Sequence, residues 1–221
     1  MRWGRSLGLL LGLLVSLYMR GAMAAEAAAP QEADPHAGRP ARQILIVGDS
    51  LSAEYGLPRD TGWVQIIAQR LKRGEQAYQI RNASISGDTT GNGLQRLPAL
   101  LEETRPDIVV IQLGANDGLR GLPLRDMKAN LQKMIALSRA KGAQVLLIGQ
   151  HIPPNYGRRY ADQFHAIYAE LAKENAIPLV PFMLEGIALE AGMFQADGLH
   201  PTVEAQTPIA DTIWPHLEAL L

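Results

Sequence analysis

Short runs of consecutive apolar residues alternate with longer helix-like segments, and this alternation constrains the fold more than any other feature. The runs are predicted to be strands, and they cover residues 43–47, 78–83, 107–113, 145–149 and 177–180. Most of them are apolar at successive positions rather than at every second one. That pattern is typical of parallel strands that are buried on both faces.

Each run is followed by a segment with apolar residues at helical spacing, at 62–71, 94–103, 124–141, 160–175 and 203–220. In the last segment we expect Pro208 and Pro215 to break or kink the helix. Strands that alternate with helices, without an internal repeat, predict a single α/β domain. Its central parallel sheet of about five strands would be covered by helices on both faces.

The first 24 residues have the pattern of a secretory signal peptide. Arg2 and Arg5 give a positive start, residues 6–19 are apolar and uncharged, and a small-x-small sequence ends at Ala24. An uncleaved membrane anchor is the alternative, but the apolar stretch is shorter than the roughly 20 residues that a span needs. We therefore expect cleavage after Ala24, a periplasmic or secreted product, and no stable membrane span in the mature chain.

Residues 25–41 are rich in Ala and Pro and lack apolar periodicity, which predicts a disordered lead-in before a domain at 42–221. Removing the three arginines of the signal segment leaves 18 basic and 22 acidic residues. That balance argues against a nucleic-acid partner. The sequence has no cysteine, which excludes disulfides, thiolate metal sites and cysteine nucleophiles.

Polar residues that could carry chemistry directly follow four of the predicted strands. They are Asp49 and Ser50, residues 86–88, Asn116 and Asp117, and His151. In open α/β sheets, ligands bind beyond the carboxyl ends of the strands. We therefore expect these residues to meet at one edge of the sheet.

Ser50 is a candidate nucleophile, because a serine hydroxyl becomes reactive when an oriented base takes its proton. Asp197 and His200 fit the roles of orienting group and base. Gly198 allows a tight turn between them, which can bring the carboxylate to one ring nitrogen. An isolated D-x-x-H sequence is also typical of a surface turn. His151 is a second candidate by its position after a strand, and its role stays open.

Gly87 and Asn116 could donate hydrogen bonds to a developing negative oxygen, one from the backbone and one from the side chain. Taken singly, each is better explained as an ordinary turn residue. Asp197 and His200 form a close pair of potential metal ligands, but two ligands are too few for a metal site. Walker and dinucleotide-binding sequences are missing as well, so we expect neither a metal nor a cofactor.

Four short sequences occur in an order that resembles the SGNH/GDSL family of serine hydrolases. They are Gly48-Asp49-Ser50-Leu51-Ser52, Gly87, Gly114-Ala115-Asn116-Asp117 and Asp197-Gly198-Leu199-His200-Pro201. Three more look like the periplasmic bacterial branch known as thioesterase I, lysophospholipase L1-type or arylesterase, at residues 84–90, 116–121 and 154–160.

The resemblance implies a flavodoxin-like three-layer α/β/α sandwich and a role for each matching residue. Ser50 would be the nucleophile, His200 the general base and then acid, and Asp197 the residue that orients His200. The oxyanion hole would consist of the backbone N–H groups of Ser50 and Gly87 with the Asn116 side chain. No metal or cofactor would be required.

The resemblance also places residues 119–123 in a loop beside the acyl pocket. We expect Leu122, Pro123, Ile152 and Pro153 to offer an apolar rim to an acyl chain, although plain loop packing would explain the prolines nearly as well.

The predicted function is that of a secreted, monomeric serine esterase. Its substrates would be small-molecule aryl esters, acyl thioesters and lysophospholipids, including lysolipids derived from a membrane. Two alternatives remain open: a carbohydrate O-deacetylase of the same family, and a non-catalytic binding protein that retains the scaffold.

Overall fold

The fold is taken from a computed structural model, which describes residues 41–74 and 77–221. The predicted signal peptide, 1–24, and nearly all of the predicted lead-in, 25–41, lie outside the described residues. Within the described part of the chain, no helix has the length and apolar character needed to cross a membrane.

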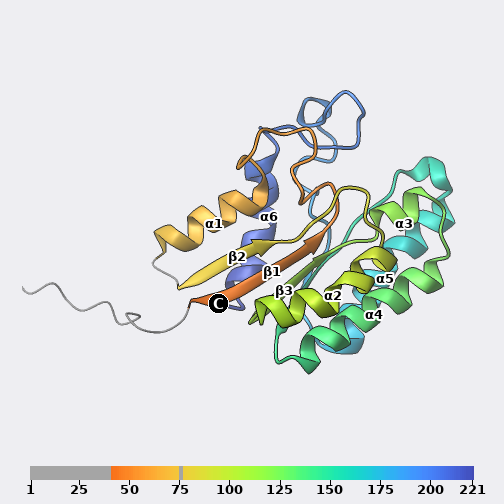
Figure 1. The fold of residues 1–221 in the computed structure, drawn as a ribbon. Helices are drawn as coiled ribbons and strands as arrows, with labels where there is room; N and C mark the ends of the chain where they lie inside the picture. The colour runs from red at the N-terminus through yellow and green to blue at the C-terminus, as the bar shows by residue number, and fades with distance from the viewer. Residues whose placement is uncertain (1–40, 75–76) are drawn as a thin grey trace, which may run out of the picture. The chain divides into compact units, whose positions relative to one another are not determined.

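Five parallel strands form one sheet in the order β2-β1-β3-β4-β5, which confirms the predicted α/β architecture (Figure 1). The strands are β1 (Arg42–Gly48), β2 (Tyr78–Asn82), β3 (Ile108–Gln112), β4 (Gln144–Ile148) and β5 (Leu179–Val180). Strand β1 pairs with β2 on one side and β3 on the other, so the order of the strands reverses there. The crevice of an open α/β sheet forms at such a reversal.

The central strands are apolar at successive positions because each face of the sheet has its own core. In β1, Leu45 and Val47 belong to one buried cluster, whereas Ile44 and Ile46 belong to the other. All four side chains are fully buried. Successive side chains of a strand point to opposite faces, so both faces of β1 are covered.

Two layers of helices cover the sheet and complete the predicted three-layer sandwich (Figure 1). One layer contains α2 (Thr90–Thr104), α4 (Leu124–Ala140) and α5 (Arg158–Asn175), and the other contains α1 (Trp63–Arg73) and α6 (Gln206–Glu218). A short helix, α3 (Ala115–Leu119), and two 3₁₀ turns, Pro154–Tyr156 and Ala191–Met193, lie in the connections.

The last helix differs from the sequence prediction, because neither proline breaks it. Pro208 is the third residue of α6, where a backbone N–H has no partner within the helix in any case. Pro215 lies within the helix, which continues to Glu218. The predicted break is therefore wrong, whereas the alternative of a kink at either proline stays a prediction.

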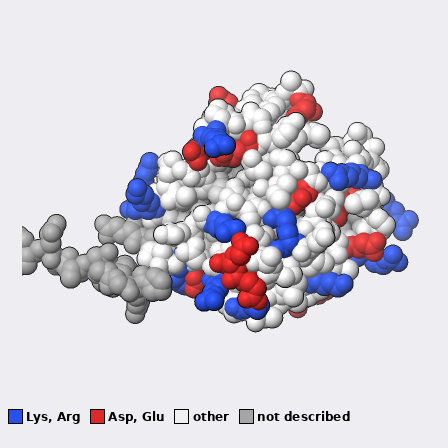
Figure 2. Space-filling view, in the orientation of Figure 1, with Lys and Arg blue, Asp and Glu red and all other residues white. Residues whose placement is uncertain are grey.

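Charged side chains of both signs are interspersed over the face drawn in Figure 2. Ion pairs at the surface of the described chain include Arg81 with Glu103 and Lys141 with Glu102. The described residues on this face thus offer no broad basic patch for a polyanion.

Candidate active site

The polar residues predicted to meet at one sheet edge come from separate connections. Ser50 follows β1, Gly87 follows β2, Asn116 follows β3, and His200 lies in the long connection between β5 and α6. Ser50, Asn116 and His200 line one cavity with a volume of about 660 Å³.

Ser50, His200 and Asp197 form a continuous chain of hydrogen bonds. His200 Nε2 lies 2.9 Å from Ser50 Oγ, and His200 Nδ1 lies 2.7 Å from Asp197 Oδ2. A carboxylate on the Nδ1 side favours the tautomer with its proton on Nδ1. The Nε2 lone pair then faces the serine hydroxyl, which is the arrangement that a general base requires.

The Asp197 carboxylate is held by the turn that it belongs to. Its Oδ1 accepts hydrogen bonds from the backbone N–H groups of Leu199 and His200, both at 2.9 Å. Gly198 takes a positive φ of 66°, which allows this tight turn. Hydrogen bonds from the His200 backbone, the His200 ring and the Leu199 backbone lower the pKa of Asp197 to about 2. The residue therefore carries a full negative charge at neutral pH.

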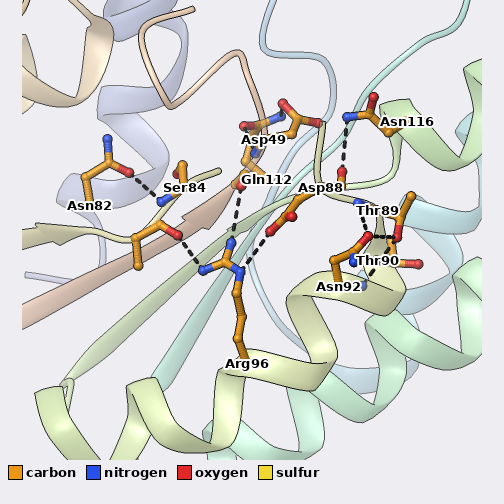
Figure 3. Close-up of polar contacts among 12 residues, drawn as sticks. Asp49, Asn82, Ser84, Asp88, Thr89, Thr90, Asn92, Arg96, Gln112 and Asn116 are labelled. Carbon is orange, nitrogen blue, oxygen red and sulfur yellow. Dashed lines mark hydrogen bonds and ion pairs between the residues drawn. The ribbon is translucent and has the colours of Figure 1, made fainter. Parts of the chain in front are cut away.

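The turn that carries Ser50 rests on a buried polar pair (Figure 3). Gln112 Nε2 donates to Asp49 Oδ1 at 2.9 Å, and Gln112 Oε1 accepts a hydrogen bond from the Ser52 hydroxyl. A Cβ atom on Gly48 would lie 2.6 Å from Gln112 Oε1, so only glycine fits there without a shift. Burial raises the pKa of Asp49 to about 6, against the lowering effect of its hydrogen bond with Gln112.

Backbone N–H groups at two of the predicted oxyanion positions are free. Within residues 41–74 and 77–221, neither Ser50 N nor Gly87 N donates a hydrogen bond to another part of the chain. Gly87 has a φ of 83°, in the left-handed region that favours glycine. The Asn116 side chain donates through Nδ2 to the Asp88 carbonyl at 3.0 Å (Figure 3), and its second amide hydrogen remains available.

Asn116 is held in place by the short helix α3, which sequence periodicity missed. Its neighbour Asp117 is buried and accepts two hydrogen bonds from Thr90, at 2.8 Å from the backbone and 2.6 Å from the hydroxyl. The first turn of α3 is thereby tied to the first turn of α2. A helix of five residues with Gly118 and two polar side chains has no apolar period to detect.

The cavity beside Ser50 has mostly apolar walls. Among the predicted substrate contacts, Ile152 and Pro153 line it, together with Phe182, Met183 and Phe194. Leu122 and Pro123 do not line it.

Leu122 and Pro123 lie between α3 and the start of α4. The carbonyl of Leu122 accepts a hydrogen bond from the Tyr160 hydroxyl at 3.1 Å, and Pro123 is the N-cap residue of α4. Their place in the structure supports the alternative reading of ordinary loop packing.

His151 also lines the cavity but does not bond to Ser50, whose hydroxyl faces His200. Its ring stacks on His165, with 3.6 Å between the ring centres. Burial, and secondarily the neighbouring His165, lower the pKa of His151. The sequence did not indicate this pair, because His165 lies on α5 and nothing in its local pattern marks it.

No group of three or more histidine or carboxylate side chains that could hold a metal ion occurs among residues 41–74 and 77–221.

Comparison with known proteins decides the family. Residues 46–207 match the GDSL-like Lipase/Acylhydrolase family. The chain belongs to this family. Its membership confirms the predicted GDSL resemblance and the predicted enzyme class, a GDSL-type ester hydrolase.

Individual members of the GDSL-like family are similar over most of the chain. Esterase TesA from Pseudomonas aeruginosa is 49% identical over 181 residues, which cover 82% of this chain and 90% of that protein. Thioesterase 1/protease 1/lysophospholipase L1 from Escherichia coli K12 is 42% identical over 178 residues, covering 80% and 84%. A crystal structure of TesA superposes with a TM-score of 0.80 at 48% identity, and it covers 81% of this chain and all of that one.

Proposed function

We propose that this protein is an exported serine esterase that hydrolyses carboxylic esters and thioesters through an acyl-serine intermediate. The observation that carries the proposal is the chain of hydrogen bonds from Asp197 through His200 to Ser50, beside the free N–H groups of Ser50 and Gly87. A nucleophile, an oriented base and donors for an oxyanion are the parts that acyl transfer requires.

In the first half of the reaction, Ser50 Oγ attacks the substrate carbonyl while His200 Nε2 takes the hydroxyl proton. The carbonyl oxygen becomes negative and accepts hydrogen bonds from the Ser50 and Gly87 N–H groups and from Asn116. His200 then gives its proton to the departing alcohol or thiol, the bond to the leaving group breaks, and the acyl group remains on Ser50.

In the second half, a water molecule takes the place of the leaving group. His200 Nε2 accepts a proton from this water as its oxygen attacks the acyl carbonyl, and the same three donors hold the second oxyanion. Collapse breaks the bond to Ser50 Oγ, His200 returns the proton to that oxygen, and the free acid leaves. The ionised Asp197 stabilises the imidazolium form of His200 in both halves.

We assign aryl esters, acyl thioesters and lysophospholipids as substrates. The cavity of about 660 Å³, walled by Ile152, Phe182, Met183 and Phe194, offers apolar surface to an acyl chain. One similar protein is named thioesterase 1/protease 1/lysophospholipase L1, which agrees with this range. An O-deacetylase needs space for an acetyl group only.

A p-nitrophenyl ester series from acetate to palmitate, measured on the full-length protein, tests the substrate range. We expect hydrolysis of medium and long acyl chains as well as acetate, because the cavity exceeds the volume of an acetyl group. Activity confined to acetate would favour the O-deacetylase.

A fluorophosphonate probe tests the chemistry separately. It should label the protein at Ser50, and Ser50→Ala should abolish both labelling and hydrolysis. A folded sample that is not labelled would leave only the non-catalytic binding protein.

We further propose that the chain is exported and cleaved after Ala24, on the basis of residues 1–24. The measurement is the N-terminal sequence of the protein recovered from a periplasmic extract. Retention of the first 24 residues on a membrane-bound product would contradict the proposal.

A further inference from the structure

One arginine on α2 connects the two loops that carry Ser50 and Gly87. The Arg96 guanidinium donates from Nε to Asp88 Oδ2 at 2.8 Å, from Nη1 to the Ala83 carbonyl, and from Nη2 towards the Gly48 carbonyl at 3.5 Å (Figure 3). Gly48 is the last residue of β1, whereas Ala83 and Asp88 lie in the connection between β2 and α2. Arg96 itself lies outside the cavity lining.

Each acceptor lies close in the chain to an oxyanion donor. Gly48 lies two residues before Ser50, and Asp88 directly follows Gly87. Ala83 directly follows β2, the strand from which the Gly87 loop departs. A planar guanidinium with five N–H groups in a rigid arrangement can hold several acceptors at fixed spacing, which a lysine ammonium cannot do.

Asp88 also links Arg96 to Asn116, the third predicted oxyanion donor. Its carboxylate is held by Arg96, while its backbone carbonyl accepts the hydrogen bond from Asn116 Nδ2 at 3.0 Å (Figure 3). Arg96 therefore bonds directly to the segments that carry Ser50 and Gly87, and it is linked to Asn116 through Asp88. A second arginine that contacts the Gly87 loop, Arg120 at the end of α3, is exposed, and its side chain bonds only to the Gly87 carbonyl, at 2.9 Å, among the described residues.

The Arg96–Asp88 pair is also set apart by its burial. Its side chains are 21% and 12% exposed, whereas those of the Arg81–Glu103 pair on the same side of the sheet are 49% and 57% exposed. Exposed pairs contribute little, because water screens them and their side chains stay mobile. A mostly buried pair with several hydrogen bonds keeps a fixed geometry.

We propose that Arg96 is a positioning residue of the oxyanion hole. Its guanidinium sets the spacing between the Ser50 loop and the Gly87 loop, so that the N–H groups of Ser50, Gly87 and Asn116 converge on one point. The inference rests on the proposed function and adds to it a residue that neither touches substrate nor belongs to the Asp197–His200–Ser50 chain.

The inference predicts a loss in kcat with little change in KM. Oxyanion donors act on charge that develops in the transition state, so their displacement leaves binding of the neutral ester nearly unaltered. A misplacement of about 1 Å can lower a rate by roughly 100-fold. We expect Arg96→Met to lower kcat by about 10- to 100-fold on p-nitrophenyl butyrate.

Two further variants separate positioning from charge and from folding. Arg96→Lys keeps the charge but cannot reach three acceptors at once, so its kcat should lie between those of Arg96→Met and the wild type. Arg81→Met removes an exposed ion pair and should leave kcat unchanged. Thermal unfolding of every variant reports whether it is folded under the assay conditions, and Arg96→Lys decides the question if Arg96→Met does not fold.

A double-mutant cycle with Asn116→Ala gives a readout that general destabilisation does not move. If Arg96 acts by aligning the oxyanion donors, its own effect on kcat should be smaller in a variant that already lacks the Asn116 donor. The combined loss in kcat should then be smaller than the product of the two single losses.

The result that overturns the inference is an active wild type in which Arg96→Met and Arg96→Lys keep full kcat. Losses that multiply in the cycle with Asn116→Ala would overturn it as well. Failure of the proposed function looks different: the wild type and Arg81→Met would then neither hydrolyse esters nor be labelled at Ser50.

Discussion

His200 is held on both sides of its ring, by Asp197 at Nδ1 and by Ser50 at Nε2. The Tyr55 ring also packs against it, with 4.4 Å between the ring centres. As the proposed base, His200 would lose little freedom on receiving a proton, because it is already held at three points, which is the advantage of a preorganised site. The orienting carboxylate should therefore matter more for rate than for fold.

Replacing Asp197 by Asn tests this. The amide can turn its N–H₂ group towards Nδ1, which would favour the wrong tautomer and turn a protonated Nε2 towards Ser50. We expect kcat to fall by roughly 10³- to 10⁴-fold, as is typical when the orienting acid is lost. Steady-state kinetics on p-nitrophenyl butyrate measure the loss. A decrease of less than tenfold would show that another group orients His200.

Asp49 gives a prediction for stability rather than for rate. Its pKa rises from 3.8 to about 6 on folding, so the folded state binds a proton more tightly than the unfolded state. Stability is then highest at low pH for this group, and it falls as the pH rises from about 4 to about 6. Burial of the charged form is the cause, because Asp49 Oδ2 has no hydrogen-bond partner among the described residues.

Asp49→Asn should therefore be stabilising relative to the wild type at pH 8 but not at pH 4. The difference between the two pH values should be up to about 3 kcal/mol, from the shift in pKa. Urea unfolding at pH 4 and pH 8 measures it. An equal effect of the substitution at both pH values would mean that the Asp49 pKa is not raised.

At the scale of elements, the junction between β3 and α3 places Asn116. Gly114 has a φ of 125°, and a Cβ atom there would lie 2.2 Å from Tyr168 Oη and 2.9 Å from Met127 Cε. The Tyr168 hydroxyl is buried and donates to the Leu113 carbonyl at 3.0 Å. The junction thus has neither the backbone freedom nor the space for another residue.

Gly114→Ala should lower both stability and kcat. We expect a loss of about 1–3 kcal/mol in the free energy of unfolding, because an L-residue is strained at this φ and the core has to shift. The kcat should fall as well, because Asn116 lies only two residues after Gly114 and a shift of the backbone at Gly114 would displace it. Gly91→Ala on α2 is the control, since a Cβ there would meet no atom closer than 3.6 Å. Equal effects of the two substitutions would contradict the argument.

Sequence reasoning predicted the elements better than their polar contacts. The strands were found because β1 and β3 are apolar on both faces, a property of each segment alone. Gln112 and Arg96 were missed, because a glutamine in a strand and an arginine in a helix have no local mark. Their partners Asp49 and Asp88 lie 63 and 8 residues away, and only the fold brings them together.

The predicted substrate contacts show the same limit. Ile152 and Pro153 line the cavity, whereas Leu122 and Pro123 do not, although all four are apolar loop residues. The difference arises because α3 redirects the chain towards α4 before Leu122, and the five residues of α3 carry no detectable period. The path of a loop can depend on a helix that is too short to give a detectable pattern in the sequence.

At the scale of the whole molecule, the cavity is a product of several connections rather than of one element. Its walls come from the segments after β1, β3 and β4, from α5, and from the long segment between β5 and α6. Substrate range should therefore be adjustable from that last segment without disturbing Ser50.

Ala188 offers such a test, because it lines the cavity and is exposed enough to accept a larger side chain. Ala188→Phe should lower kcat/KM for the palmitate ester about 10-fold more than for the acetate ester, since the ring occupies part of the cavity. Leu189→Ala is the control, because Leu189 is fully exposed and does not line the cavity. An equal loss for both esters would show that this wall does not contact the acyl chain.

The hydrogen bond between Ser50 and His200 joins residues that are 150 positions apart. Strands β2, β3, β4 and β5 all lie between these two residues in the sequence. A chain that ends before residue 200 therefore has the serine hydroxyl but not its hydrogen-bond partner. Because the two residues meet only when the strands between them are in place, recovery of ester hydrolysis during refolding of the complete chain would report closure of the whole sheet.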